Sequence, residues 1–287
     1  MNSRYQYREY AYLYCGDMDG TLLNSENRIS ERTREVLQWL IDEGHYVVPA
    51  TGRTRILIPE EFSVLQGVKC GITENGAVVW DYDKNEMIWR KPMPEGIVSD
   101  IFKDVQESGI SGWIGEAYTK GIAYADAADR EFVIAKADKL EKTFVDYFLD
   151  RHEFVENLPG RKDILDCSEK VNIYFDNLDN SRNLREKWKD MEDVAVTTSI
   201  SGNAEFNAAG VDKGVGLAML RSRLGIDRAH VIAFGDNEND LEMLEAAGIG
   251  VAMGNAKQYV KDVANEVTGD NDHDGVAEFL EKYFECI

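Results

Sequence analysis

The chain has 287 residues, of which 44% are hydrophobic and 10% aromatic, a composition that excludes disordered, collagen-like and low-complexity proteins. It carries 32 basic and 53 acidic residues, which give a formal net charge of −21. Such a charge repels phosphate backbones and anionic lipids, so we expect neither nucleic acid nor membrane as a partner. A small anionic ligand would therefore need a local cation, a lysine or the amides of a helix N-terminus.

Cysteine usage and the lack of targeting signals predict a cytoplasmic protein. The four cysteines are scattered and form no CxxC pair, as is usual in proteins that are kept reduced. Residues 1–14 lack the apolar stretch and the cleavage site of a signal peptide. No apolar run reaches the roughly 18 residues that a membrane helix requires.

Predicted strands and helices alternate in the first part of the chain. Ser30 is placed to cap a helix that Gly44 closes. Short apolar runs predict strands over residues 11–15, 46–50, 69–73 and 77–80. Because this alternation is typical of a parallel sheet with right-handed crossovers, we expect an α/β fold.

The middle of the chain has a different pattern and no catalytic signature. Helices are predicted over residues 95–108, 130–150 and 181–191, and strands over 121–125 and 171–175.

The first pattern returns after residue 207. Asp212 is placed to cap a helix that ends before Gly225, and strands are predicted over residues 231–234 and 250–253. We therefore interpret residues 1–82 and 196–287 as one discontinuous α/β core, interrupted by an inserted α/β domain of residues 83–195.

Polar turns lie beside the predicted core strands, whose carboxyl ends bind ligands in open parallel sheets. Asp17 and Asp19 could cap backbone amides, or one could attack a substrate while the other moves a proton. Thr51 could cap the next helix or hold a phosphate oxygen. The turns are Asp17-Met18-Asp19-Gly20-Thr21, Thr51-Gly52-Arg53, Asp212-Lys213-Gly214 and Gly235-Asp236-Asn237-Glu238-Asn239-Asp240.

Lys213 and Asp236 are harder to explain by structure alone. Lys213 lies in the first turn of its predicted helix, where the helix dipole disfavours a cation by up to about 1 kcal/mol, and a bound anion would remove that conflict. Asp236 directly follows a predicted strand and Gly235. Mg²⁺ takes one or two carboxylates plus a substrate phosphate, and Asp17 and Asp236 could supply those carboxylates from adjacent strand ends.

These motifs together carry a family resemblance. The order Asp-x-Asp-Gly-Thr, Thr-Gly-Arg, a lone lysine and Gly-Asp-x-x-Asn-Asp resembles the haloacid dehalogenase (HAD) superfamily. The insertion of residues 83–195, with Glu74-Asn75-Gly76-Ala77 just before it, is similar to the Cof-type subfamily with a large α/β cap of the C2 type. The resemblance spans nearly the whole chain and implies a Rossmann-like parallel-sheet core with a cap that sets substrate specificity.

The resemblance also implies roles for single residues. Asp17 is the expected nucleophile, which forms an aspartyl-phosphate, and Asp19 is the expected general acid and base. The expected cofactor is Mg²⁺, held by Asp17, Asp236 and the backbone carbonyl of Asp19, with Asp240 behind them. The expected ligands of the phosphoryl oxygens are the amides of Met18 and Gly52 and the side chains of Thr51, Lys213 and Asn239.

The implied activity is Mg²⁺-dependent hydrolysis of a small phosphomonoester, a sugar phosphate or a related metabolite by family analogy. Two alternatives remain open. One is a phosphomutase of the same superfamily, which returns the phosphoryl group to the substrate. The other is a non-catalytic regulatory protein that binds a phosphorylated metabolite.

Arg53 and the acidic segment near the C-terminus have competing interpretations. Arg53 could reach substrate, but an arginine at a helix start is more often a surface salt-bridge partner. The segment Asp270–Gly275, with Glu281, matches a calcium-binding loop. Because residues 276–284 predict a terminal helix that Asp274 caps, we expect Glu281 to remain in that helix rather than to bind Ca²⁺.

Overall fold

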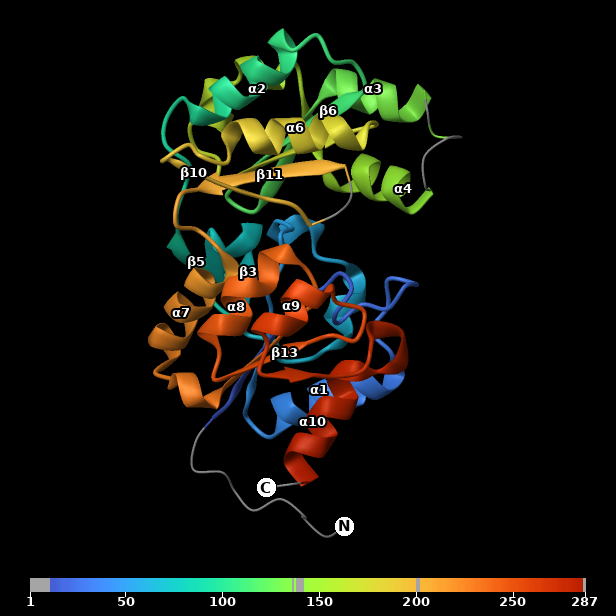
Figure 1. The fold of residues 1–287 in the computed structure, drawn as a ribbon, viewed down its shortest axis with the longest axis vertical. Coiled ribbons are helices and arrows are strands. Elements are labelled where there is room, and N and C mark those ends of the chain that lie inside the picture. The colour runs from blue at the N-terminus through green and yellow to red at the C-terminus, as the bar shows by residue number, and fades with distance from the viewer. Residues whose placement is uncertain (1–10, 136, 138–141, 200–201, 286–287) are drawn as a thin grey trace.

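In the computed structural model, residues 11–135, 137, 142–199 and 202–285 are described, and their strands form three sheets. Figure 1 shows two regions, one above the other: the lower holds α1, α7 to α10, β3, β5 and β13, and the upper holds α2 to α4, α6, β6, β10 and β11. The chain passes from the lower region to the upper one and back, so both ends of the described chain lie in the lower region.

The lower region contains a parallel sheet, as the sequence predicts, and its five strands lie in the order β14-β13-β12-β1-β2. Consecutive residues of a strand face opposite sides, so Leu13 and Cys15 pack toward one layer of helices and Tyr14 toward the other. The strands are β1 (Leu13–Gly16), β2 (Tyr46–Pro49), β12 (Val231–Gly235), β13 (Ile249–Ala252) and β14 (Glu266–Val267).

Helices cover both faces of this sheet. Ser30 caps α1 by accepting from the Thr33 amide, and Asp212 caps α7 by accepting from the Val215 amide, as predicted. One face carries α1 (Glu31–Asp42) and α10 (Gly275–Glu285), and the other carries α7 (Lys213–Leu224), α8 (Leu241–Ala246) and α9 (Gln258–Val263). None of the described helices has the length and apolar character needed to cross a membrane.

Residues 69–80 do not continue the parallel sheet as predicted. They form β3 (Cys70–Thr73) and β4 (Val78–Asp81), which pair antiparallel, and β5 (Glu86–Arg90) pairs antiparallel with β4. A parallel connection needs a dozen or more residues, whereas only the short 3₁₀ turn η3 (Glu74–Gly76) and Ala77 separate β3 from β4. A single parallel bridge, from Ala50 to Ile72, places β3 beside β2.

The upper region is built on a six-stranded sheet in the order β10-β11-β9-β6-β7-β8, antiparallel except for β7 and β8. The strands are β6 (Trp113–Thr119), β7 (Ile122–Asp126), β8 (Glu153–Val155), β9 (Lys170–Phe175), β10 (Val194–Thr197) and β11 (Asn203–Ala208). The helices are α2 (Ile97–Glu107), α3 (Ala127–Ala135), α4 (Lys142–Arg151), α5 (Lys162–Leu165) and α6 (Leu178–Trp188).

One expectation for the upper region needs correction. The single helix predicted over residues 130–150 is two helices, α3 and α4, and part of the link between them lies outside the described residues. The boundaries expected at residues 83 and 195 fall within the β4–β5 hairpin and within β10, which pairs with β11. Lys91 directly follows β5 and Ala209 directly follows β11, and the Lys91 Nζ donates to the Ala209 carbonyl at 2.6 Å.

Candidate active site

Asp17 and Asp236 meet at the carboxyl edge of the parallel sheet, as expected for adjacent strand ends. Asp17 directly follows β1 and Asp236 directly follows β12, and these two strands pair with Gly16 beside Phe234. Asp17, Asp236 and Asp240 each offer a carboxylate oxygen within 4.8 Å of the other two. Three acidic groups thus converge on one point.

Lys213 is a buried cation in contact with two of these three aspartates. Its Nζ donates to the Oδ1 of Asp17 at 2.6 Å and to the Oδ1 of Asp240 at 2.7 Å, and its side chain is fully buried. Burial lowers the pKa of Lys213, but the two carboxylates outweigh burial and raise that pKa, so the ammonium form persists. Lys213, the first residue of α7, therefore fixes the position of one carboxylate oxygen of Asp17.

Asp240 shapes the turn after β12. While its Oδ1 accepts from Lys213, its Oδ2 accepts from the amides of Asp236 at 2.9 Å and of Asn237 at 3.0 Å. Both oxygens of Asp240 are thus engaged within the protein. Asp240 therefore connects Lys213 to the two amides that follow β12.

The charge balance of the cluster suits a divalent cation. Burial raises the pKa of Asp17 well above its ordinary value and that of Asp236 to about 6, and the neighbouring carboxylates add to both shifts. Thr21 Oγ1 partly compensates by donating to the Oδ1 of Asp236 at 2.8 Å. The buried carboxylate of Asp17 and the half-buried carboxylate of Asp236 offer oxygens in a surplus of negative charge, which are the donors that Mg²⁺ prefers, so the residues present fit this ion.

Arg53 holds Asp19 on the opposite side of the site. Its Nε donates to the Oδ2 and its Nη2 to the Oδ1 of Asp19, both at 2.8 Å. Burial raises the pKa of Asp19, but the guanidinium outweighs burial and holds that pKa below its ordinary value. Arg53 is a salt-bridge partner, but its pair belongs to the site and not to an exposed surface, because Asp19 and Arg53 both line the cavity described next.

A cavity of about 770 Å³ joins these residues to the upper region. The cavity wall includes five of the residues predicted from sequence: Asp17, Asp19, Thr51, Gly52 and Asn239. The Thr51 Oγ1 accepts from the Arg53 amide at 3.1 Å, so it caps the turn after β2 rather than a helix start. The Met18 side chain is fully buried, so only its backbone is suited to bind a ligand.

The upper region supplies a cavity wall that sequence reasoning missed. β6 contributes Glu116 and Tyr118, β9 contributes Lys170, Asn172 and Tyr174, β11 contributes Glu205, and α4 contributes Tyr147. A signal exists in the sequence of β9, where polar or amphipathic residues at positions 170, 172 and 174 alternate with Val171, Ile173 and Phe175 of the core.

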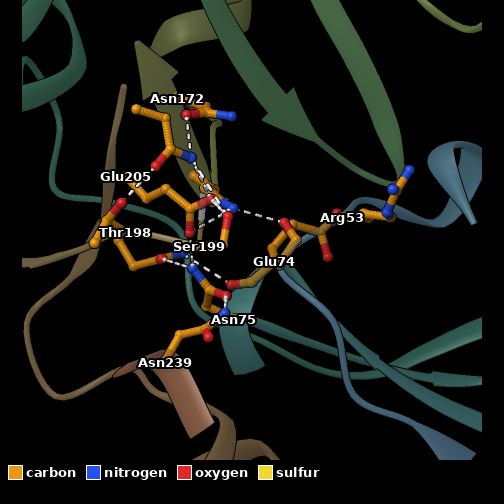
Figure 2. A network of polar contacts seen from close by, with 12 residues as sticks. Arg53, Glu74, Asn75, Asn172, Thr198, Ser199, Glu205 and Asn239 are labelled. Atoms are coloured by element: carbon orange, nitrogen blue, oxygen red, sulfur yellow. Dashed lines mark hydrogen bonds and ion pairs between the residues drawn. The ribbon is translucent and has the colours of Figure 1, made fainter. Parts of the chain in front are cut away.

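Polar contacts join this wall to the lower region. In Figure 2, Asn75 lies between Asn239 and Glu205. The Asn75 Nδ2 donates to the Glu205 Oε2 at 2.6 Å, and the Asn239 Nδ2 donates to the Asn75 Oδ1 at 3.1 Å. Asn75 thus connects one predicted phosphate ligand to a strand of the upper sheet.

The acidic segment near the C-terminus is arranged as a turn, and Glu281 stays in α10 as expected. The Asp270 carboxylate accepts from the Asp272 amide at 3.1 Å, and the Asp272 carboxylate accepts from the Ser25 amide at 2.7 Å. Glu281 pairs with Arg32 at 2.5 Å. Within the part of the chain that is described, the acidic group suited to a metal is the one at Asp17, Asp236 and Asp240.

Comparison with known proteins agrees with this geometry. Residues 14–280 match the family of haloacid dehalogenase-like hydrolases. The chain is 30% identical over 264 residues to 5-amino-6-(5-phospho-D-ribitylamino)uracil phosphatase YcsE of Bacillus subtilis, covering 92% of each chain. It is 27% identical to pyridoxal phosphate phosphatase YbhA of Escherichia coli, covering 92% of this chain and 95% of that one. A solved haloacid dehalogenase-like hydrolase from B. subtilis superposes with a TM-score of 0.80 at 26% identity, over 94% of this chain and 99% of that one.

Proposed function

Because the chain belongs to the Cof-type haloacid dehalogenase-like hydrolases and is a phosphoric monoester hydrolase, we propose a Mg²⁺-dependent mechanism in which Asp17 is the nucleophile. The observation that carries the proposal is that Asp236 and Lys213 converge on Asp17, which lines one cavity together with Asp19. Lys213 holds one oxygen of Asp17 at 2.6 Å and so orients the carboxylate. Such positioning is the main task of the protein in phosphoryl transfer.

In the first step a carboxylate oxygen of Asp17 attacks phosphorus and the bond to the leaving oxygen breaks. Asp19, when protonated, gives its proton to that oxygen, and the alcohol leaves an aspartyl-phosphate behind. In the second step Asp19 takes a proton from water and the water oxygen attacks phosphorus. The bond from phosphorus to the Asp17 oxygen breaks, so inorganic phosphate leaves and the Asp17 carboxylate is restored. The ion pair with Arg53 favours the carboxylate form of Asp19, which is the form that the second step requires.

The remaining residues of the site bind charge. Thr51, the amides of Met18 and Gly52, Lys213 and Asn239 would hold the phosphoryl oxygens. Asp17, Asp236 and the backbone carbonyl of Asp19 would hold Mg²⁺, with Asp240 supporting them. When bound, the ion neutralises charge on the phosphoryl group.

We propose a small phosphorylated metabolite as substrate, with a sugar or sugar-like leaving group. The distal wall combines tyrosine rings, from Tyr118, Tyr147 and Tyr174, with the polar groups of Glu116 and Asn172. Rings pack against the faces of a sugar or heterocycle, while amide and carboxylate groups bind its hydroxyls. The names of the relatives cited above point to leaving groups with these two features, a ribityl chain on a pyrimidine and a pyridine ring.

The test is release of inorganic phosphate from a panel of phosphorylated sugars, pyridoxal phosphate and nucleotides, with Mg²⁺ or with EDTA. Substitution Asp17→Asn should lower turnover by about a thousandfold or more, because an amide cannot attack phosphorus. Asp179→Asn is the matched control, because it makes the same carboxylate-to-amide change at an exposed side chain of α6. Turnover retained in Asp17→Asn would reject the nucleophile. Phosphate release without a bisphosphate activator would separate a phosphatase from a phosphomutase.

A further inference from the structure

Lys170 is a buried cation of the upper sheet that reaches into the lower region. It begins β9, its side chain is 1% exposed, and its Nζ donates to the Gly52 carbonyl at 2.7 Å. The same Nζ lies 3.0 Å from the Oε2 of Glu205 on β11. One side chain therefore joins the upper sheet to the turn that carries Thr51 and Gly52.

Lys170 and Asn75 pack directly against Gly52. A β-carbon at position 52 would lie 2.8 Å from the Asn75 Oδ1, closer than real contacts of a β-carbon, and 3.0 Å from the Lys170 Nζ, tighter than most of them. Glycine is needed here because these two side chains occupy the space, not because of its backbone angles. The turn is thus held in place by groups from both regions.

Glu205 and Asn75 make a second connection of the same kind. The Oε1 of Glu205 accepts from Ser199 at 2.6 Å and from Asn203 at 3.0 Å, while its Oε2 accepts from Asn75 at 2.6 Å (Figure 2). Asn75 in turn accepts from Asn239 at 3.1 Å. Both ends of the network thus lie on residues proposed to bind the phosphoryl group, Gly52 and Asn239.

The backbone at Asn75 shows that this connection has an energetic cost. Glu74, Asn75 and Gly76 all have positive φ, of 50°, 54° and 91°. Left-handed conformations at residues other than glycine are strained and persist when surrounding contacts over-determine them. The buried pair of Lys170 and Glu205 is likewise expensive to desolvate, and an apolar pair of similar volume is often as stable. Stability alone therefore does not explain the network.

We propose that Lys170, acting through Gly52, and Glu205, acting through Asn75, are positioning residues for the phosphoryl-binding turns. These turns reach their working arrangement only when β9 and β11 of the upper sheet are seated on the lower region. The inference rests on the proposed function, because Gly52 and Asn239 bind phosphate only within it. The Nζ of Lys170 is engaged by the Gly52 carbonyl and by Glu205, so we assign Lys170 to positioning and not to the reacting atoms.

The experiment compares Lys170→Met with Lys170→Arg and with the double variant Lys170→Met/Glu205→Gln, which leaves no unpaired buried charge. Lys120→Met is the matched control, because Lys120 is exposed on the next turn of the same sheet and does not line the cavity. Two quantities are measured: kcat and KM for a phosphomonoester that the wild type hydrolyses, and hydrogen exchange of the amides of residues 51–53.

Both Lys170→Met variants lose a hydrogen bond that a charged group donates. We therefore expect KM to rise by about tenfold or more, and kcat to change by less than about threefold. Exchange of the amides of residues 51–53 should become about tenfold faster. Lys170→Arg should recover most of the KM, since a guanidinium can reach the same two oxygens.

Two results would overturn the inference. One is an unchanged KM together with unchanged exchange in the double variant. The other is failure of both methionine variants to fold, which would give the pair a purely structural role. If the wild type released no phosphate from any substrate, the proposed function would fail, while the exchange measurement would still decide whether Lys170 holds the Gly52 turn.

Discussion

At the scale of single residues, the site concentrates like charges that the folded chain alone does not balance. Asp17, Asp236 and Asp240 share Lys213 as their buried cation, and burial raises the pKa of both Asp17 and Asp236. Buried like charges destabilise a fold, and a cation bound as we propose would offset that cost.

Substitution Asp236→Asn should therefore separate stability from cation binding. At pH 7.5 in EDTA the variant should unfold at a temperature several degrees above that of the wild type, because one of the repelling carboxylates is gone. Added Mg²⁺ should raise the unfolding temperature of the wild type, since a ligand that binds only the folded state stabilises it. The variant should show little of this rise.

Thermal unfolding with EDTA and with Mg²⁺, for both proteins, measures these effects. Asp179→Asn serves again as the control for loss of an exposed carboxylate. An equal Mg²⁺-dependent rise in wild type and in Asp236→Asn would place the cation somewhere other than the Asp17 and Asp236 pair.

At the scale of elements, the turn η3 combines strained backbone with a buried acid. Glu74 is fully buried, and burial, with the nearby Glu169 adding to it, raises the pKa of Glu74 from 4.5 to about 8. Between these two values the folded chain keeps a proton that the unfolded chain releases. The free energy of unfolding contributed by this group is therefore complete below about pH 4.5 and is lost as the pH rises toward 8.

Substitution Glu74→Gln should remove that part of the pH dependence. The wild type should lose more stability than the variant between pH 5.5 and pH 8.5, because glutamine cannot ionise. Urea unfolding at the two pH values gives the free energies, and the difference between the proteins isolates Glu74 from other buried acids. Exposed Glu192→Gln is the control. Parallel curves for wild type and Glu74→Gln would show that Glu74 does not hold its proton in the folded chain.

The elements also show what the sequence can predict. The caps at Ser30 and Asp212 are local signals, and both were predicted correctly. Asp17 and Asp236 could be placed together because each follows a strand of a parallel sheet, and carboxyl ends of such strands share an edge. These inferences use only short-range patterns and one rule of topology.

Contacts that depend on register between distant strands could not be predicted in this way. Lys170 reaches Gly52 only because β9 pairs with β11 on one side and with β6 on the other, in an antiparallel sheet whose pairing the sequence does not specify. The pair of Arg53 with Asp19 depends on the path of the turn after β2. The general preference of arginine for exposed ion pairs does not predict that path.

At the scale of the whole molecule, we propose that the upper region is an insertion that begins after Lys91 and ends before Ala209. Because the Lys91 Nζ donates to the Ala209 carbonyl, the two chain segments that would link the regions lie within the length of one lysine side chain. Four contacts seat the upper region over the site: Gly121 with Ile56, Tyr147 with Leu57, Arg151 with Glu60, and Lys170 with Gly52. All four meet the segment that follows β2 and lines the cavity.

Replacing residues 92–208 by about three glycine and serine residues, which span about 10 Å, should leave a chain that still folds its parallel sheet. It should keep stabilisation by Mg²⁺, since Asp17, Asp236 and Lys213 remain. Its kcat/KM for a metabolite should fall by about a hundredfold or more, because the wall of Tyr118, Asn172 and Tyr174 and the Lys170 contact are gone.

A phosphomonoester with a very small leaving group should be affected less, since it makes few contacts with that wall. Circular dichroism, unfolding temperature with and without Mg²⁺, and kinetics on both substrate types distinguish the outcomes. A shortened chain that keeps the substrate preference of the full chain would show that the upper region does not select the leaving group. Loss of the parallel sheet would show instead that residues 92–208 are part of one folding unit with the rest, so that the seating contacts stabilise the core as well as cover it.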